Sequence, residues 1–135
     1  MFVVDASIAF AWCFEDESTS ATDNVLHRLI LEGGIAPAHW PLELANALRF
    51  AASSGRVDEL AISRARSIVT ELPVDVLPIE TSTALGLIDA ARRHDLTVYD
   101  AAYLELAEVR GLGLATLDER LAAACRTVGV ALIAA

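Results

Sequence analysis

The sequence contains no lysine, and all ten of its basic residues are arginine. Receiver-type phosphoacceptor domains and haloacid-type phosphatases both gather aspartates on a parallel sheet, and both normally need a lysine to neutralise the phosphate. The chain also lacks a P-loop, the glycine-rich loop whose backbone amides hold nucleotide phosphates. These absences count against phosphoryl-transfer functions.

Cysteine is scarce as well. Cys13 and Cys125 lie in apolar helical segments and lack the spacing of a disulfide framework or a metal site. His27, His39 and His94 also show no ligand-like spacing, so we interpret them as surface or hydrogen-bonded groups. The cysteine pattern is typical of a reducing compartment, and we expect a cytoplasmic protein.

Long apolar runs are missing too. No run is long enough to span a bilayer, and Asp5 interrupts the first hydrophobic run, which argues against a signal peptide and against membrane attachment. With 135 residues, 55% of them hydrophobic, the chain can form one good core, and we predict a single domain over residues 1–135. The mean hydropathy of +0.47 indicates apolar surface besides the core, which favours a homodimer or a protein partner.

Strand-like and helix-like segments alternate along the chain. Strands are predicted over residues 2–4, 35–38, 74–78, 112–115 and 130–133. Helices are predicted over residues 6–14, 21–32, 41–55, 59–72, 81–94, 100–110 and 118–127. This alternation predicts an α/β fold, a three-layer α/β/α sandwich with a central parallel sheet.

Two acidic residues stand near predicted strand ends in the first half of the chain. Asp5 follows the first strand directly, where sites of open parallel sheets lie, although Asp5 or Ser7 could simply cap the next helix. Glu43 and Asn46 are three residues apart and share one helix face. A solvent-facing glutamate is the ordinary alternative for Glu43.

Two more acidic residues stand at predicted helix starts in the second half. Asp100 opens a helix, where a carboxylate also stabilises the helix dipole. Thr116 and Glu119 have the spacing of a capping box ahead of Leu121. Such a box would explain both of these residues without catalysis, but it would leave Asp118, which lies between them, unexplained.

The four carboxylates would converge at one edge of a parallel sheet, and convergent carboxylates repel one another. A hard cation resolves this conflict. Ligand sets made only of oxygen select Mg²⁺ or Mn²⁺ over zinc. A bound cation would also offset locally the net charge of −9, which opposes contact with nucleic-acid phosphates.

Four motifs, taken in order, resemble the PIN domain, and specifically the VapC-type toxin nucleases of bacterial and archaeal toxin–antitoxin pairs. They are Val-Val-Asp-Ala-Ser at 3–7, Glu-Leu-Ala-Asn-Ala-Leu at 43–48, Thr-Val-Tyr-Asp-Ala-Ala-Tyr-Leu at 97–104 and Ala-Thr-Leu-Asp-Glu-Arg-Leu at 115–121. The resemblance covers essentially the whole chain. It implies a PIN-like nuclease domain over residues 1–135 that hydrolyses RNA with the help of Mg²⁺, or of Mn²⁺ in its place.

The resemblance also implies roles for individual residues. The catalytic residues would be Asp5, Glu43, Asp100 and Asp118. Asp5, Asp100 and Asp118 would bind the metal, while Ser7, Asn46 and Thr116 would support them. Nucleases acting on branched DNA share the broader fold but usually carry extra DNA-binding segments, for which this chain has no room, so RNA is the expected substrate.

A cognate VapB-type antitoxin is the partner that the resemblance implies. Trp12, Phe14, Trp40 and Phe50 lie near the acidic motifs, and they are either core residues or parts of a groove for that partner. Two alternatives stay open: a catalytically silent PIN-fold module that acts only through partners, and a PIN-like nuclease that is not a toxin.

Overall fold

The computed structural model describes residues 1–133 and contains one parallel sheet of four strands. The strands are β1 (Phe2–Val4), β2 (Gly34–Pro37), β3 (Val74–Leu77) and β4 (Leu114–Ala115), and their order in the sheet is β3-β2-β1-β4. Phe2 pairs with Gly34, and Val3 pairs with Ile35 on one side and Leu114 on the other. β1 therefore lies in the interior of the sheet, and Asp5 follows its carboxyl end.

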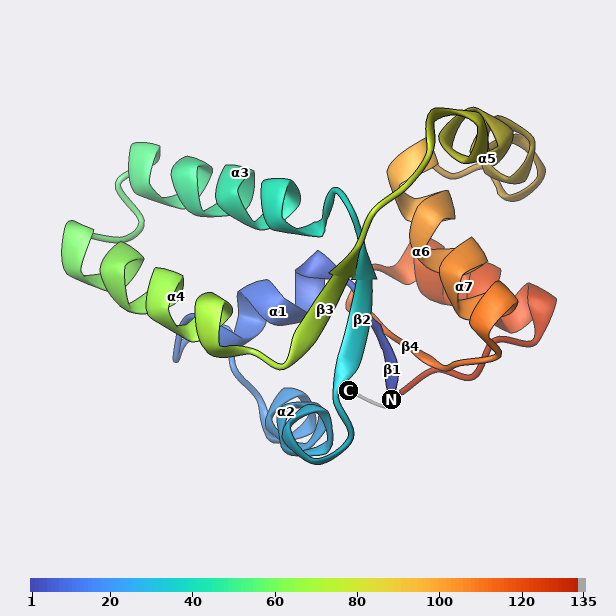
Figure 1. Ribbon diagram of the computed structural model, residues 1–135. Coiled ribbons are helices and arrows are strands. Elements are labelled where there is room, and N and C mark those ends of the chain that lie inside the picture. Colours follow the sequence, from blue (N-terminus) through green and yellow to red (C-terminus); the bar gives the residue numbers. More distant parts are fainter. Residues whose placement is uncertain (134–135) are drawn as a thin grey trace.

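Helices cover both faces of the sheet (Figure 1). On one side lie α1 (Ala6–Trp12), α2 (Ser20–Glu32), α3 (Trp40–Ser53) and α4 (Glu59–Glu71). On the other side lie α5 (Thr81–His94), α6 (Val98–Arg110) and α7 (Glu119–Val128). The predicted α/β/α sandwich with a central parallel sheet is thus confirmed.

Local sequence signals explain where several elements begin and why the sheet packs closely. Thr19 forms a capping box with Thr22 at the start of α2, and Pro41 occupies the first turn of α3, where its missing N–H costs nothing. At Gly34 an added Cβ would approach Leu29 Cδ1 to 2.7 Å and Val4 Cγ2 to 2.8 Å. Only glycine fits between β1 and α2 at this position.

The main core lies between the sheet and the helices, and it includes the whole of β1. Its largest fully buried side chains include Phe2, Ile8, Leu44, Tyr103 and Leu121. Leu44 and Tyr103 belong to the helices that also carry Glu43 and Asp100, so burial of these neighbours fixes where the two carboxylates emerge.

Several predicted element bounds were wrong, and two of the differences have a clear physical reason. Residues 130–133 form no strand; a single parallel bridge joins Leu132 to Leu114. β4 has only two residues, so it offers little edge for a fifth strand to pair with. The helix predicted to open at Asp100 begins at Val98, because the Thr97 side chain caps it by accepting from the Asp100 N–H at 3.1 Å.

Within the part of the chain that the structure describes, no helix is both long and apolar enough to cross a membrane.

Candidate active site

All four acidic residues singled out in the sequence line one cavity of about 400 Å³. Asp5 joins β1 to α1, Glu43 and Asp100 lie in the first turns of α3 and α6, and Asp118 is the N-cap of α7. The remaining lining residues are Ala6, Ser7, Phe10, Ala47 and Leu117. Side chains from four separate segments therefore meet beyond the carboxyl ends of the strands, as the parallel topology requires.

Asp5 is held by two hydroxyl groups. Ser7 Oγ and Thr116 Oγ1 each lie 2.6 Å from Asp5 Oδ2, and both donate to it. The two hydroxyl oxygens are in turn tied to the backbone, because Ser7 Oγ accepts from Leu117 N and Thr116 Oγ1 accepts from Asp118 N, each at 2.9 Å. Asp5 stands at the N-cap position of α1 but makes no capping hydrogen bond, so the alternative of a plain cap is wrong.

Asp118 caps α7, which corrects the prediction for this turn. Its Oδ1 accepts from Leu121 N at 2.9 Å, and the Thr116 hydroxyl that was expected to form a capping box is bound to Asp5 instead. The helix begins at Glu119, two residues later than a capping box with Thr116 as the N-cap requires. Asp118 therefore has a structural role as well as a place in the cavity.

Glu43 is partly buried rather than facing solvent. Tyr103 Oη donates to Glu43 Oε1 at 2.8 Å, and His39 Nε2 lies 3.0 Å from the same oxygen. Burial is the main reason why the pKa of Tyr103 is raised far above its ordinary value, and the charges of Asp5 and Glu43 add to this effect. The phenol therefore stays protonated and acts as a permanent donor.

The contacts of His39 and Tyr103 with Glu43 were not predicted from the sequence. We interpreted His39 as a surface or hydrogen-bonded group, but its Nε2 is buried and makes no hydrogen bond within the described residues, despite its closeness to Glu43. The sequence spacing of these residues did indicate that they lie near the site carboxylates. His39 stands four residues before Glu43, and Tyr103 stands three residues after Asp100, so each shares a helical face with a site carboxylate.

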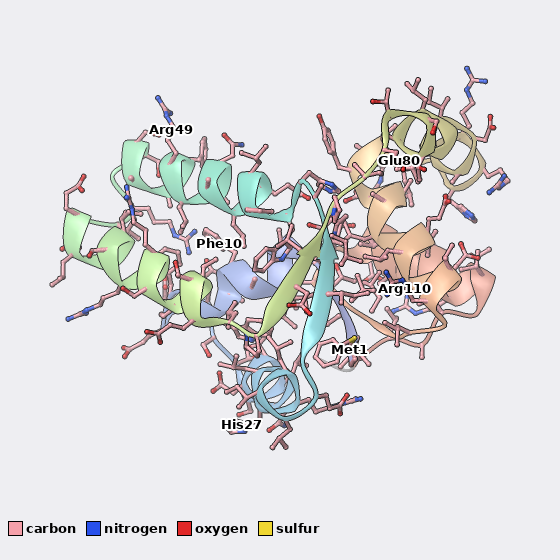
Figure 2. The ribbon with its side chains drawn as sticks, viewed as in Figure 1. Met1, Phe10, His27, Arg49, Glu80 and Arg110 are labelled. Carbon is pink, nitrogen blue, oxygen red and sulfur yellow. The ribbon has the colours of Figure 1, made fainter. Side chains whose placement is uncertain are left out.

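The charges of the cavity act on one another. Burial raises the pKa of Asp5, and the charges of Glu43 and Asp118 raise it further, while the bonds from Ser7 and Thr116 oppose this shift. Burial also raises the pKa of Asp100 to about 6, with additional effects from Asp118, Asp5 and Glu43. No arginine lines the cavity among residues 1–133, and Arg49 of α3 points away from the molecule (Figure 2).

The donor set fits a hard divalent cation. Asp5, Glu43 and Asp118 each have one oxygen held by the protein, and the hydrogen bonds of the described residues leave the other oxygen free. Within residues 1–133 no three acidic, histidine or cysteine side chains are close enough to hold a metal ion together by direct contact. Mg²⁺ keeps several of its waters and binds through only one or two carboxylates, so a cavity of this size suits it.

The other sequence-predicted residues have different positions. Ser7 and Thr116 support Asp5, whereas Asn46 is exposed on α3 and does not line the cavity. Of the aromatic residues considered for a partner groove, three are core residues and only Phe50 is exposed, at 72%. The three buried residues are Trp12, Phe14 and Trp40. An exposed aromatic groove made of all four is therefore excluded.

Comparisons with known proteins agree with this geometry. The family model described as the PIN domain matches residues 2–127. The chain is 36% identical over 89 residues to the protein named Ribonuclease VapC3 from Mycobacterium tuberculosis, in strains CDC 1551 / Oshkosh and ATCC 25618 / H37Rv. That match spans 66% of this chain and 63% of the length of the curated relatives.

Two solved structures have a similar fold. The crystal structure of PAE2754 from Pyrobaculum aerophilum has a TM-score of 0.73 and 28% identity, covering 98% of this chain and 90% of that one. The crystal structure of Mycobacterium tuberculosis VapC20, a sarcin–ricin loop cleaving toxin, has a TM-score of 0.63 and 17% identity, covering 92% of this chain and 95% of that one. The second likeness concerns the fold alone.

Proposed function

This chain belongs to the PIN domain family, and we propose that it is a divalent-cation-dependent endoribonuclease acting as the toxin of a VapBC-type pair. The observation that carries the proposal is the convergence of Asp5, Glu43, Asp100 and Asp118 on one cavity that no arginine or lysine of residues 1–133 lines. Four carboxylates without a compensating cation are stable only if a metal ion joins them or some stay protonated. The name of the Ribonuclease VapC3 relatives supports RNA as the substrate.

Asp5, Asp100 and Asp118 would hold Mg²⁺ directly or through its bound waters, with Mn²⁺ as a possible substitute. The bound cation would lower the pKa of a coordinated water and offset charge at the scissile phosphate. Ser7 and Thr116 fix one oxygen of Asp5, and the α7 backbone fixes one oxygen of Asp118, which leaves the other oxygen of each residue available to a cation in the cavity that both line. Glu43 would hold the cation or help to position the attacking water, whose attack leaves a 5′-phosphate and a 3′-hydroxyl.

An end-labelled RNA tests this reaction. We expect cleavage in Mg²⁺ or Mn²⁺, no cleavage after complete chelation, and products with 5′-phosphate and 3′-hydroxyl ends. Metal affinity and cleavage should be measured on the same sample. Cyclic phosphate ends, or activity that persists without metal, would instead indicate a metal-independent ribonuclease, and metal binding without cleavage would favour a silent PIN-fold module.

The partners that we propose are a cognate VapB-type antitoxin and a second copy of the chain. The name of the VapC3 relatives supports the antitoxin, and the net charge of −9 favours a basic contacting segment. Large apolar side chains exposed by more than 70% support association; they are Leu31, Leu42, Phe50 and Val109. An RNA-cleaving toxin of this kind would act in the cytoplasm.

Expression in a host tests the toxin role. Expression alone should arrest growth, and co-expression with the neighbouring small open reading frame should restore growth by forming a stable complex. Light scattering on the purified protein should show a dimer. A protein that is harmless, monomeric and retains no partner from its own host would be a PIN nuclease without a toxin role.

A further inference from the structure

Two aromatic side chains meet at one oxygen of Glu43. Tyr103 Oη donates to Oε1 at 2.8 Å, and His39 Nε2 lies 3.0 Å from the same atom. No hydrogen bond from residues 1–133 reaches Oε2. The two oxygens of Glu43 therefore differ: one is surrounded by protein groups, and the other is available to the cavity that Glu43 lines.

The His39 ring also connects the two helices that carry Glu43 and Asp100. Its centroid lies 5.1 Å from that of Tyr103 and 5.2 Å from that of Tyr99, and both tyrosines belong to α6. His39 itself is the N-cap residue of α3, and its carbonyl accepts from Glu43 N at 3.0 Å. The packing of the His39 ring on the two tyrosines therefore holds the first turn of α3 in place next to the first turn of α6.

We propose that His39 and Tyr103 are positioning residues that hold Oε1 of Glu43 and so present Oε2 to the acidic cavity. We call this pair the Glu43 brace. The inference rests on the proposed function, because it assigns the pair a role in arranging that same site for its cation and its attacking water.

Electrostatics explains why Glu43 needs such a brace. Three rotatable bonds separate its carboxylate from the helix, and fixing a glutamate side chain costs about 1.5–2 kcal/mol of entropy. Glu43 also raises the pKa values of Asp5 and Asp100, which means that the three charges repel one another across the cavity. Without the brace, this repulsion would turn Glu43 out toward solvent.

The two members contribute differently. Tyr103 is fully buried in the core, so its phenol is fixed and its hydrogen bond to a charged oxygen is strong. His39 Nε2 is close to Oε1 but is not aligned for a hydrogen bond. His39 therefore contributes through the closeness of its ring to Oε1 and through its packing against Tyr99 and Tyr103.

Calorimetric titration of the metal-free protein with Mn²⁺ tests the role of His39 and Tyr103 through the metal affinity, without relying on activity. Tyr103→Phe keeps the ring and removes the hydroxyl, and should weaken Mn²⁺ binding about tenfold. His39→Phe keeps an aromatic ring and removes Nε2, and should weaken binding roughly threefold. His39→Gln places an amide nitrogen near the position of Nε2 and should restore most of the affinity.

Tyr99→Phe is the matched control, because it removes the hydroxyl of the neighbouring tyrosine, whose ring contacts His39 but which forms no hydrogen bond with Glu43. Its Mn²⁺ affinity should stay within twofold of the wild type. Thermal melts of the metal-free variants show whether the fold is intact. If Tyr103→Phe does not fold, the comparison of His39→Phe with His39→Gln decides the outcome.

A double-mutant cycle shows whether the pair acts through Glu43. In a Glu43→Gln background, Tyr103→Phe should cause less than a twofold further loss of Mn²⁺ affinity. An equal loss in both backgrounds, or no loss in the wild-type background, overturns the brace while leaving the proposed function intact. A wild-type protein that binds no Mn²⁺ overturns the proposed function and the brace together.

Discussion

The two halves of the acidic cavity are positioned by different means. In the strand half, Asp5 and Asp118 are fixed by hydroxyls and amides close to the ends of β1 and β4. In the helix half, Glu43 and Asp100 stand in the first turns of α3 and α6. Glu43 accepts a hydrogen bond from Tyr103, and His39 lies against the same oxygen. The strand half is therefore part of the fold itself, whereas the helix half depends on packing between two helices.

Removing a charge from the strand half should have the largest effect. Asp5→Asn should lower the cleavage rate about 10²–10³-fold and abolish measurable Mn²⁺ binding, because Asp5 is only 4% exposed and lies at the centre of the charge network. Glu43→Gln in the helix half should lose less Mn²⁺ affinity. Calorimetry and cleavage assays on both variants measure the difference.

Asp5→Asn should also stabilise the metal-free fold, by about 1 kcal/mol in the free energy of unfolding, because it removes repulsion and keeps an acceptor for Ser7 and Thr116. Equal Mn²⁺ affinity in Asp5→Asn and wild type would remove Asp5 from the ligand set and with it the distinction between the two halves.

The hydroxyl support of the strand half should have the next largest effect. Thr116→Val removes a donor to Asp5 and an acceptor for Asp118 N, so the free energy of unfolding should fall by about 1–3 kcal/mol. Urea denaturation measures this change. Thr127→Val, which removes an exposed hydroxyl on α7, is the matched control and should change little. A stable Thr116→Val protein would show that the strand half is not fixed in this way.

The raised pKa of Asp100, in the helix half, should make the stability of the metal-free protein depend on pH. The folded-state pKa of Asp100 is about 6 and exceeds its ordinary value of 3.8, so the folded chain keeps this proton longer than the unfolded chain. Stability without metal should therefore fall as the pH rises from about 4 to about 6, by on the order of 1 kcal/mol after allowance for the partial exposure of this residue.

Asp100→Asn should remove part of that fall, and Asp5 accounts for some of the remainder because its pKa is also raised. Urea unfolding at several pH values between 4 and 7 measures the effect, with exposed Asp89→Asn on α5 as the control. Identical pH profiles for Asp100→Asn and the wild type would contradict the raised pKa and the charge coupling across the cavity.

The fold and the position of Asp5 could be predicted from the sequence, because both follow from local patterns. Alternating apolar segments predict the parallel sheet, and Asp5 stands directly after a strand that is entirely buried. The end of the chain was predicted less well: residues 130–133 have the apolar character of a strand, but whether they pair depends on the length of β4.

The contacts of the helix half could not be predicted in this way. Tyr103 and Glu43 are separated by 60 residues, and their hydrogen bond depends on how α3 and α6 pack. The capping pattern around Asp118 was misassigned for a related reason. Thr116 binds the distant Asp5 rather than capping α7, and no local pattern records that competition.

Locating a bound cation tests the central claim most directly. Crystals grown with Mn²⁺ would give an anomalous difference peak at the metal position. We predict a single strong site, or two adjacent sites, in the cavity between Asp5, Asp100 and Asp118, with Glu43 Oε2 turned toward it and Oε1 still bound to Tyr103. A fully occupied peak elsewhere on the molecule, with this cavity empty at saturating Mn²⁺, would contradict the account.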